Sequence, residues 1–354
     1  MLICFSYFDR GDETMRTGLA ALAALAFLPA PAAAQPSDAA KMERVADEAA
    51  RWTEQLNAAL AAGSAGFETL NQKVQPLFAA VPTREKVAAE APAIRRLIEQ
   101  NREHVRRSDA MLAALPAYPS GMPTDIPAER LVAEARGQNV RLMELLRHYE
   151  AVVVAMAAGD IAGLDRARPK LAEGIFALVG QQGLIFRNRQ ASVPATASSH
   201  QALGIAAQIY RAMVAVAQQG LAARENGGAR AEAAALALRS ELGLVARETR
   251  ALTAAGRLNL KRELAEFEAL RDESKKDAAQ VRLADRALAV TRAEEKSFEI
   301  GDRLAAFADS GSGLTAAQLR GAGARPLLTS LTILESDFMD SAAEQAALGG
   351  DGPK

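Results

Sequence analysis

A seven-residue repeat between residues 128 and 157 constrains the fold more than any other feature of this chain. Side chains that favour a helix interface recur there in alternating steps of four and three: Leu131, Ala135, Gln138, Leu142, Leu145, Tyr149, Val152 and Met156. This spacing is typical of a helix that packs along its length against a neighbour at a shallow angle. A second stripe widens the first: Val132, Asn139, Met143, Leu146 and Val153. We therefore expect this helix to contact more than one neighbour, as in a bundle.

Helical periodicity extends over nearly all of the chain after residue 35, and no strand hairpin signal accompanies it. Glycine and proline mark the expected helix ends, and Gly159–Asp160 is predicted to be a turn between antiparallel neighbours. Further helices are predicted at about 200–225, 229–255 and 257–308, with a break at Gly256. The charged segment 271–277 is either fully exposed or a second break. Aromatic residues are only 5% of the chain, so an alanine-rich core needs many close helix contacts.

The pattern predicts an all-α fold, an elongated bundle of long antiparallel helices that are arranged as one bundle or as two sub-bundles. Residues 35–190 are predicted to form the N-terminal helical bundle and residues 200–348 the C-terminal one. Residues 191–199 are polar and small and contain Pro194, which is typical of a linker or a crossover. Residues 349–354 (GGDGPK) are predicted to be a disordered tail.

Residues 15–35 have the parts of a secretory signal. A basic start at Arg16 precedes the apolar run Leu19–Leu28, and small residues up to Ala34 precede a predicted cleavage before Gln35. The acidic stretch 1–14 fits badly in front of such a signal, so translation is expected to start at Met15 and residues 1–34 to form a spurious leader plus signal peptide. The alternatives are an uncleaved membrane anchor and an ordinary N-terminal helix. The predicted location is the periplasm, or outside the cell after secretion.

Cleavage at this point would leave a chain without Cys4, its single cysteine, so that a disulfide is excluded from the mature protein. No later segment is long and apolar enough to be predicted as a transmembrane span. The whole chain has 42 basic and 43 acidic residues, and this balance does not indicate a nucleic-acid partner.

Charged side chains also follow a helical spacing between residues 95 and 106. Arg95, Glu99, Arg102, Glu103 and Arg106 share one face, where steps of three and four place opposite charges together. We interpret this face as a solvated ladder of ion pairs; the alternative is a basic strip that holds an anionic ligand. A second charged group is predicted to be a solvated helix face rather than a cation site: Glu294, Glu295, Glu299 and Asp302.

No catalytic, metal or nucleotide motif stands out, and the sequence favours a binding protein over an enzyme. His148 is a weak metal candidate with Glu144 one turn before it, but the repeated Glu-x-x-His of di-metal bundles is absent. A haem held by His148 and Met143 or Met156 stays open as an alternative. Covalent haem attachment is excluded, because it needs a Cys-x-x-Cys-His motif.

Two uncharged helical stretches, around 175–186 and 205–221, carry small or flexible side chains, including Gly180 and Gly183. Glycine within a helix allows a close approach of helices or forms a hinge. One interpretation is close core packing. The functional one is a ligand pocket between helices, with Tyr210 and Arg187 as polar contacts and Arg189 beside them.

The sequence therefore predicts an exported helical bundle that acts as a binding or interaction module in a bacterial-type cell envelope. Its partner is expected to be an envelope protein or a small ligand, and no cofactor is predicted. Helix faces through which copies of the chain associate are a further expectation. The alternatives are a periplasmic haem- or metal-binding bundle and a small-ligand sensor.

Overall fold

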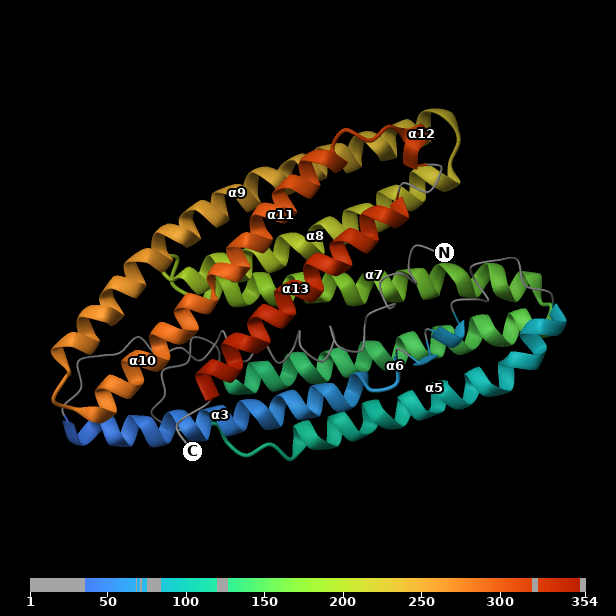
Figure 1. The fold of residues 1–354 in the computed structure, drawn as a ribbon. Coiled ribbons are helices and arrows are strands. Elements are labelled where there is room, and N and C mark those ends of the chain that lie inside the picture. The colour runs from blue at the N-terminus through green and yellow to red at the C-terminus, as the bar shows by residue number, and fades with distance from the viewer. Residues whose placement is uncertain are drawn as a thin grey trace.

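The computed structural model describes residues 36–67, 69–70, 72–74, 84–119, 127–319 and 324–350. These residues fold into helices without a strand among them, which confirms the predicted all-α fold (Figure 1). The helices run in this order: α3 (Pro36–Ser64), α5 (Arg84–Ala113), α6 (Ala128–Ala158), α7 (Ile161–Ser192), α8 (Ser198–Glu225), α9 (Gly228–Glu273), α10 (Ala278–Ala293), α11 (Glu295–Gly311), α12 (Ala316–Gln318) and α13 (Ala324–Gly350). The predicted leader, signal peptide and cleavage point lie outside the described residues.

Consecutive long helices pack against each other in an up-and-down order from α5 to α9 (Figure 1). Helices α10 and α11 then return along α9, and α13 packs against α8, α10 and α11. The first described helix, α3, lies against α5 and also contacts α10 and α13. The two ends of the described chain are thereby joined into one elongated bundle. None of the described helices is long and apolar enough to cross a bilayer.

The seam of α6 that the seven-residue repeat predicted is buried along its whole length. Its apolar members belong to a continuous hydrophobic cluster that extends from Trp52 in α3 to Ala342 in α13. The helix ends at Gly159, whose positive φ of 69° places it in the left-handed region that favours glycine. The Asp160 side chain accepts a hydrogen bond from Gly163 N and so starts α7. This tight turn makes α6 and α7 antiparallel neighbours.

The predicted linker 191–199 is a short connection between two packed helices. Helix α7 continues to Ser192 and α8 begins at Ser198, so only Val193–Ala197 lie between them. Helices α7 and α8 pack against each other, and the main hydrophobic cluster contains side chains from both sides of the connection. Whether residues 35–190 and 200–348 fold as two separate sub-bundles stays a prediction.

The predicted break at Gly256 is wrong. Helix α9 runs through this position to Glu273, and the chain instead breaks at Ser274–Asp277, within the charged segment 271–277. Gly256 serves close packing: a β-carbon added there would lie 2.1 Å from Cε1 of Phe298. The predicted helix 257–308 is also divided at Glu294, between α10 and α11.

The C-terminal boundary of the last helix differs from its prediction as well. Helix α13 extends to Gly350, two residues into the predicted disordered tail, and residues 351–354 lie outside the described part. A glycine lowers helix stability by only about 1 kcal/mol, so two glycines at the end of a packed helix do not have to stop it at once.

Candidate ligand-binding groove

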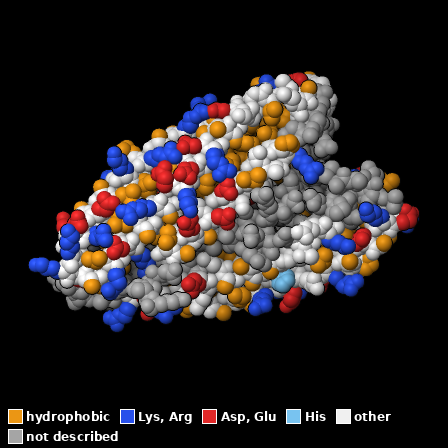
Figure 2. Space-filling view, in the orientation of Figure 1, with side chains coloured by type: hydrophobic (Ala, Val, Ile, Leu, Met, Phe, Trp, Pro, Cys, Tyr) orange, Lys and Arg blue, Asp and Glu red, His pale blue; other side chains and the backbone are white. Residues whose placement is uncertain are grey.

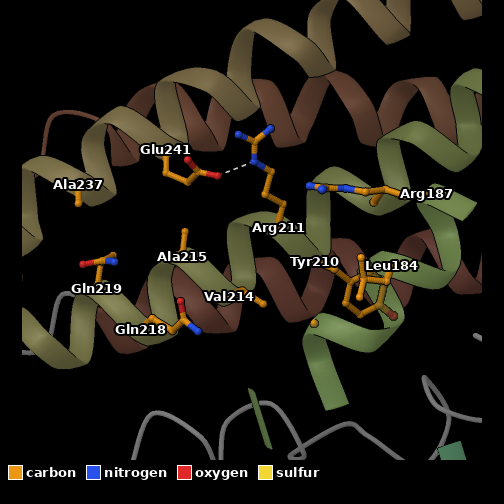
Figure 3. A pocket seen from close by; sticks show the side chains of 13 residues that line it. Leu184, Arg187, Tyr210, Arg211, Val214, Ala215, Gln218, Gln219, Ala237 and Glu241 are labelled. Carbon is orange, nitrogen blue, oxygen red and sulfur yellow. Dashed lines mark hydrogen bonds and ion pairs between the residues drawn. The ribbon is translucent and has the colours of Figure 1, made fainter. Parts of the chain in front are cut away.

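A groove of about 340 Å³ lies between α7, α8 and α9 (Figure 3). Small side chains make room for it: Gly180 and Gly183 come from α7, and Ala207 and Ala215 from α8. At Gly183, an added β-carbon would lie 3.1 Å from Cβ of Tyr210, so the two helices approach closely on this side. The remaining lining residues are Leu184, Arg187, Tyr210, Arg211, Val214, Gln218, Gln219, Ala237 and Glu241.

Each of the three helices contributes one charged side chain to the groove: Arg187 from α7, Arg211 from α8 and Glu241 from α9. Arg211 Nε donates to Glu241 Oε1 at 2.5 Å, and Arg211 Nη1 donates to Glu248 Oε2 at 2.8 Å. Partial burial opposes the Arg211 charge, but these two carboxylates outweigh it and raise the pKa of Arg211. Arg187 extends from α7 across the groove toward α8 (Figure 3). The Arg187 side chain is exposed and makes no ion pair or hydrogen bond with another described residue. The lining therefore holds one more positive than negative charge.

Tyr210 lines the groove, but its hydroxyl points into the core. The hydroxyl donates a hydrogen bond to Glu335 Oε1 of α13 at 2.5 Å, and the ring stacks on Phe186 with centroids 5.5 Å apart. Phe186 in turn meets Phe338 edge-on at 6.0 Å. The structure thus places Tyr210 beside Arg187, as the predicted pocket requires, while the hydroxyl already has a buried partner.

Arg189 lies on a different face of α7 and does not line the groove. Only 3% of it is exposed, and its Nη2 donates to Glu134 Oε2 of α6 at 3.4 Å. Burial lowers the pKa of Arg189 to about 10, against the opposing effect of Glu134. Its Nε and Nη1 have no hydrogen-bond partner among the described residues. Arg189 and Arg187 are two positions apart, which on a helix separates their directions widely.

The metal candidate His148 is half-buried on α6, and a β-carbon added at Gly174 of α7 would lie 3.3 Å from its Cδ2. Within the described ranges, no three His, Cys, Asp or Glu side chains are grouped so that they could hold a metal ion.

The two predicted charged faces have different outcomes. On α5 the ladder is confirmed for four of its five residues: Arg102 pairs with Glu99 at 3.0 Å, and Arg106 pairs with Glu99 at 3.3 Å and with Glu103 at 3.1 Å. The fifth, Arg95, pairs instead with Glu150 of α6 at 3.3 Å. Positive and negative side chains also alternate over the face drawn in Figure 2.

The acidic group at 294–302 is a solvated face only in part. Arg257 of α9 pairs with Glu295 at 2.9 Å and with Asp302 at 2.8 Å, and Glu299 is exposed. Glu294, however, is 1% exposed, so the prediction is wrong for this residue. Its burial follows from the break between α10 and α11, which turns the residue toward Ser198 of α8.

Sequence reasoning missed Arg211, although the i, i+3, i+4 spacing of 207, 210, 211, 214 and 218 places it on one face of α8 with Tyr210. It also missed Glu241, which reaches the groove from α9. Comparisons with protein-family models, with curated proteins and with solved structures find no match to this chain.

Proposed function

We propose that this protein is an exported helical-bundle binding protein of the cell envelope, and that its groove between α7, α8 and α9 binds a small amphiphile with an anionic head. The observation that carries the proposal is Arg187. Its guanidinium lies at a hollow whose lining includes both apolar and polar side chains, and it makes no ion pair or hydrogen bond with another described residue.

The chemistry of the groove supports an acid with a short hydrocarbon chain. A guanidinium presents a planar fork of donors that matches the two oxygens of a carboxylate. Leu184, which is 52% exposed, and Val214 offer apolar surface next to this fork. The amides of Gln218 and Gln219 add donors and acceptors at the other end of the hollow (Figure 3). A volume of about 340 Å³ suits a small ligand.

Titration calorimetry with octanoate and with octanol, its neutral analogue, tests this proposal. We expect octanoate to bind more tightly. Loss of a charged hydrogen-bond partner costs about 1.5–3 kcal/mol, so Arg187→Gln should weaken octanoate binding by at least about tenfold. Arg168→Gln is the matched control, because Arg168 is an exposed arginine of the same helix far from the groove. Equal binding of acid and alcohol, or an unchanged affinity in Arg187→Gln, would contradict the proposal.

Export rests on the signal-like segment 15–35 and is tested separately. Cell fractionation followed by N-terminal sequencing is expected to recover a periplasmic chain that begins at Gln35. A chain with an intact N-terminus in the cytosol would contradict export and leave the binding proposal to be judged by the titration.

A further inference from the structure

Helix α6 carries a second seven-residue repeat, on the face opposite its buried seam. The repeat follows steps of four and three, and every member is exposed: Ala133, Gly137, Val140, Glu144, Arg147, Ala151, Val154 and Ala158. We name these residues the outer stripe. Val140 is 61% exposed and Val154 is 46% exposed, which is unusual for valine. A repeat of this period with small and apolar side chains is the pattern of a helix-to-helix interface.

The outer stripe has an internal symmetry. The positions of its first four members are related to those of its last four, in reverse order, about one point midway between Leu145 and Leu146. About this point Ala133 corresponds to Ala158, Gly137 to Val154, Val140 to Ala151, and Glu144 to Arg147. Two copies related by a twofold axis through this point would therefore place alanine on alanine, valine on a small residue, and glutamate on arginine. A twofold interface requires this kind of self-complementary surface.

We propose that a second copy of this chain docks on the outer stripe, with the two α6 helices antiparallel and Glu144 of each copy paired with Arg147 of the other. This inference is independent of the groove between α7, α8 and α9, which lies on other helices.

The charges at the centre of the stripe support this occupant. Glu144 and Arg147 are both exposed, and neither side chain makes an ion pair or a hydrogen bond with another described residue. On the same helix, the exposed Arg136 pairs with Asp109 of α5 at 2.9 Å. The antiparallel arrangement gives both central charges a partner of opposite sign. Such pairs add specificity more than affinity, because they select one register over the others.

The surface beside the stripe has room for a second helix. A groove of about 730 Å³ lies between α5 and α6, and Ala133, Gly137 and Val140 line it. A β-carbon built at Gly137 has no atom of the described residues within 4 Å, so no described part of the chain covers this position. In the antiparallel pair, Val154 of the second copy lies opposite Gly137 and enters this groove. Small residues at such positions let two helices approach closely.

The expected dimer is weak and depends on concentration. The outer stripe is about 37 Å long at 1.5 Å per residue, and most of its side chains are small. A single helix pair of this kind buries less than the roughly 800 Å² per partner of a standard interface. We therefore expect a dissociation constant on the order of micromolar rather than nanomolar.

Sedimentation equilibrium of charge variants tests the pairing. We expect a monomer–dimer equilibrium for the natural chain. Glu144→Arg and Arg147→Glu should each weaken self-association by at least about tenfold, because each places like charges opposite each other twice. An equal mixture of the two variants should restore dimers, since every central contact then joins opposite charges. Lys170→Glu, an exposed charge change on α7, is the control and should leave the equilibrium unchanged.

Disulfide trapping tests the register, in chains whose natural Cys4 is replaced by serine. A mixture of Val140→Cys and Ala151→Cys chains should cross-link efficiently. A mixture of Ala133→Cys and Ala151→Cys chains, one repeat out of register, should not. Circular dichroism checks that every variant is folded. The proposal is overturned by a natural chain that stays monomeric at all concentrations, by a dimer that both charge variants leave intact, or by Val140→Cys chains that cross-link only among themselves.

Discussion

Replacement of Glu294 by glutamine should remove most of the pH dependence of stability between about pH 5 and 8. Glu294 is buried at the junction of α10 and α11, and the Ser198 hydroxyl contacts both its Oε2 and Oε2 of Glu263. The Glu263 carboxylate also accepts from Ser198 N at 2.9 Å. A hydroxyl has one hydrogen to donate. If Ser198 donates to Glu263, the contact with Glu294 requires that the Glu294 carboxyl carries a proton and donates it to Ser198 Oγ.

The magnitude follows from the pKa of Glu294. Burial raises this pKa from 4.5 to about 8. A hydrogen bond that Ser198 donates to the charged form of Glu294 opposes the shift, and the nearby charge of Glu263 adds to it. The folded chain therefore binds one more proton than the unfolded chain between these values. The stabilisation by a neutral Glu294 is fully present below about pH 4.5 and is lost as the pH rises to about 8. Within this window, the free energy of unfolding should fall by about 1.4 kcal/mol per pH unit.

Urea unfolding at about pH 5.5 and 7.5 measures this effect. We compare the free energy of unfolding of Glu294→Gln with that of the natural chain. The difference, variant minus natural chain, should rise by about 3 kcal/mol from pH 5.5 to pH 7.5, because glutamine is neutral at both values and occupies nearly the same volume. Glu232→Gln, at an exposed position on α9, is the control. Its free energy of unfolding should change with pH as that of the natural chain does. An identical pH dependence in the natural chain and Glu294→Gln would refute the assignment of the proton to this carboxyl.

Further predictions concern packing and a buried hydrogen bond. Gly256→Ala should destabilise the protein by about 1–2 kcal/mol in thermal or urea unfolding, because the new methyl group must displace the Phe298 ring, and overpacking outweighs the gain in helix propensity. Gly180→Ala, where no atom of the described residues lies within 4 Å of the added β-carbon, should instead stabilise by about 0.5–1 kcal/mol, so effects of equal sign would contradict the packing argument. Tyr210→Phe should cost about 1–3 kcal/mol, measured by urea unfolding, because Glu335 loses a buried hydrogen bond; an unchanged midpoint would contradict this.

Periodicity predicted the helices better than glycine predicted their ends. The buried seam of α6 and the turn at Gly159 follow from local spacing and from a backbone conformation that glycine favours. The same rule fails at Gly256, because a helical glycine is equally consistent with a break and with close packing against a distant ring. Phe298 lies 42 residues further along the chain, so no local pattern identifies it as the reason for this glycine.

The candidate groove was predictable only in part. Small residues near Gly180 and Gly183 indicated space between helices, and Arg187 and Tyr210 both line the groove that lies there. That Arg189 and Arg187 point in different directions follows from their spacing of two residues on a helix. The burial of Arg189 against Glu134 was not predictable, because α6 supplies that partner. The hydrogen bond from Tyr210 to Glu335 was not predictable either, because Glu335 of α13 lies 125 residues further along the chain.

By itself, the sequence determined that the chain forms long helices with apolar seams, because helix formation and amphipathic spacing depend on neighbours within a few turns. Only the tertiary structure decided which helices lie side by side, and therefore which polar groups lose contact with water. Glu294, Arg189 and Glu335 are buried because of contacts between distant segments. Desolvation depends on the complete surroundings of a group, and a linear pattern does not contain them.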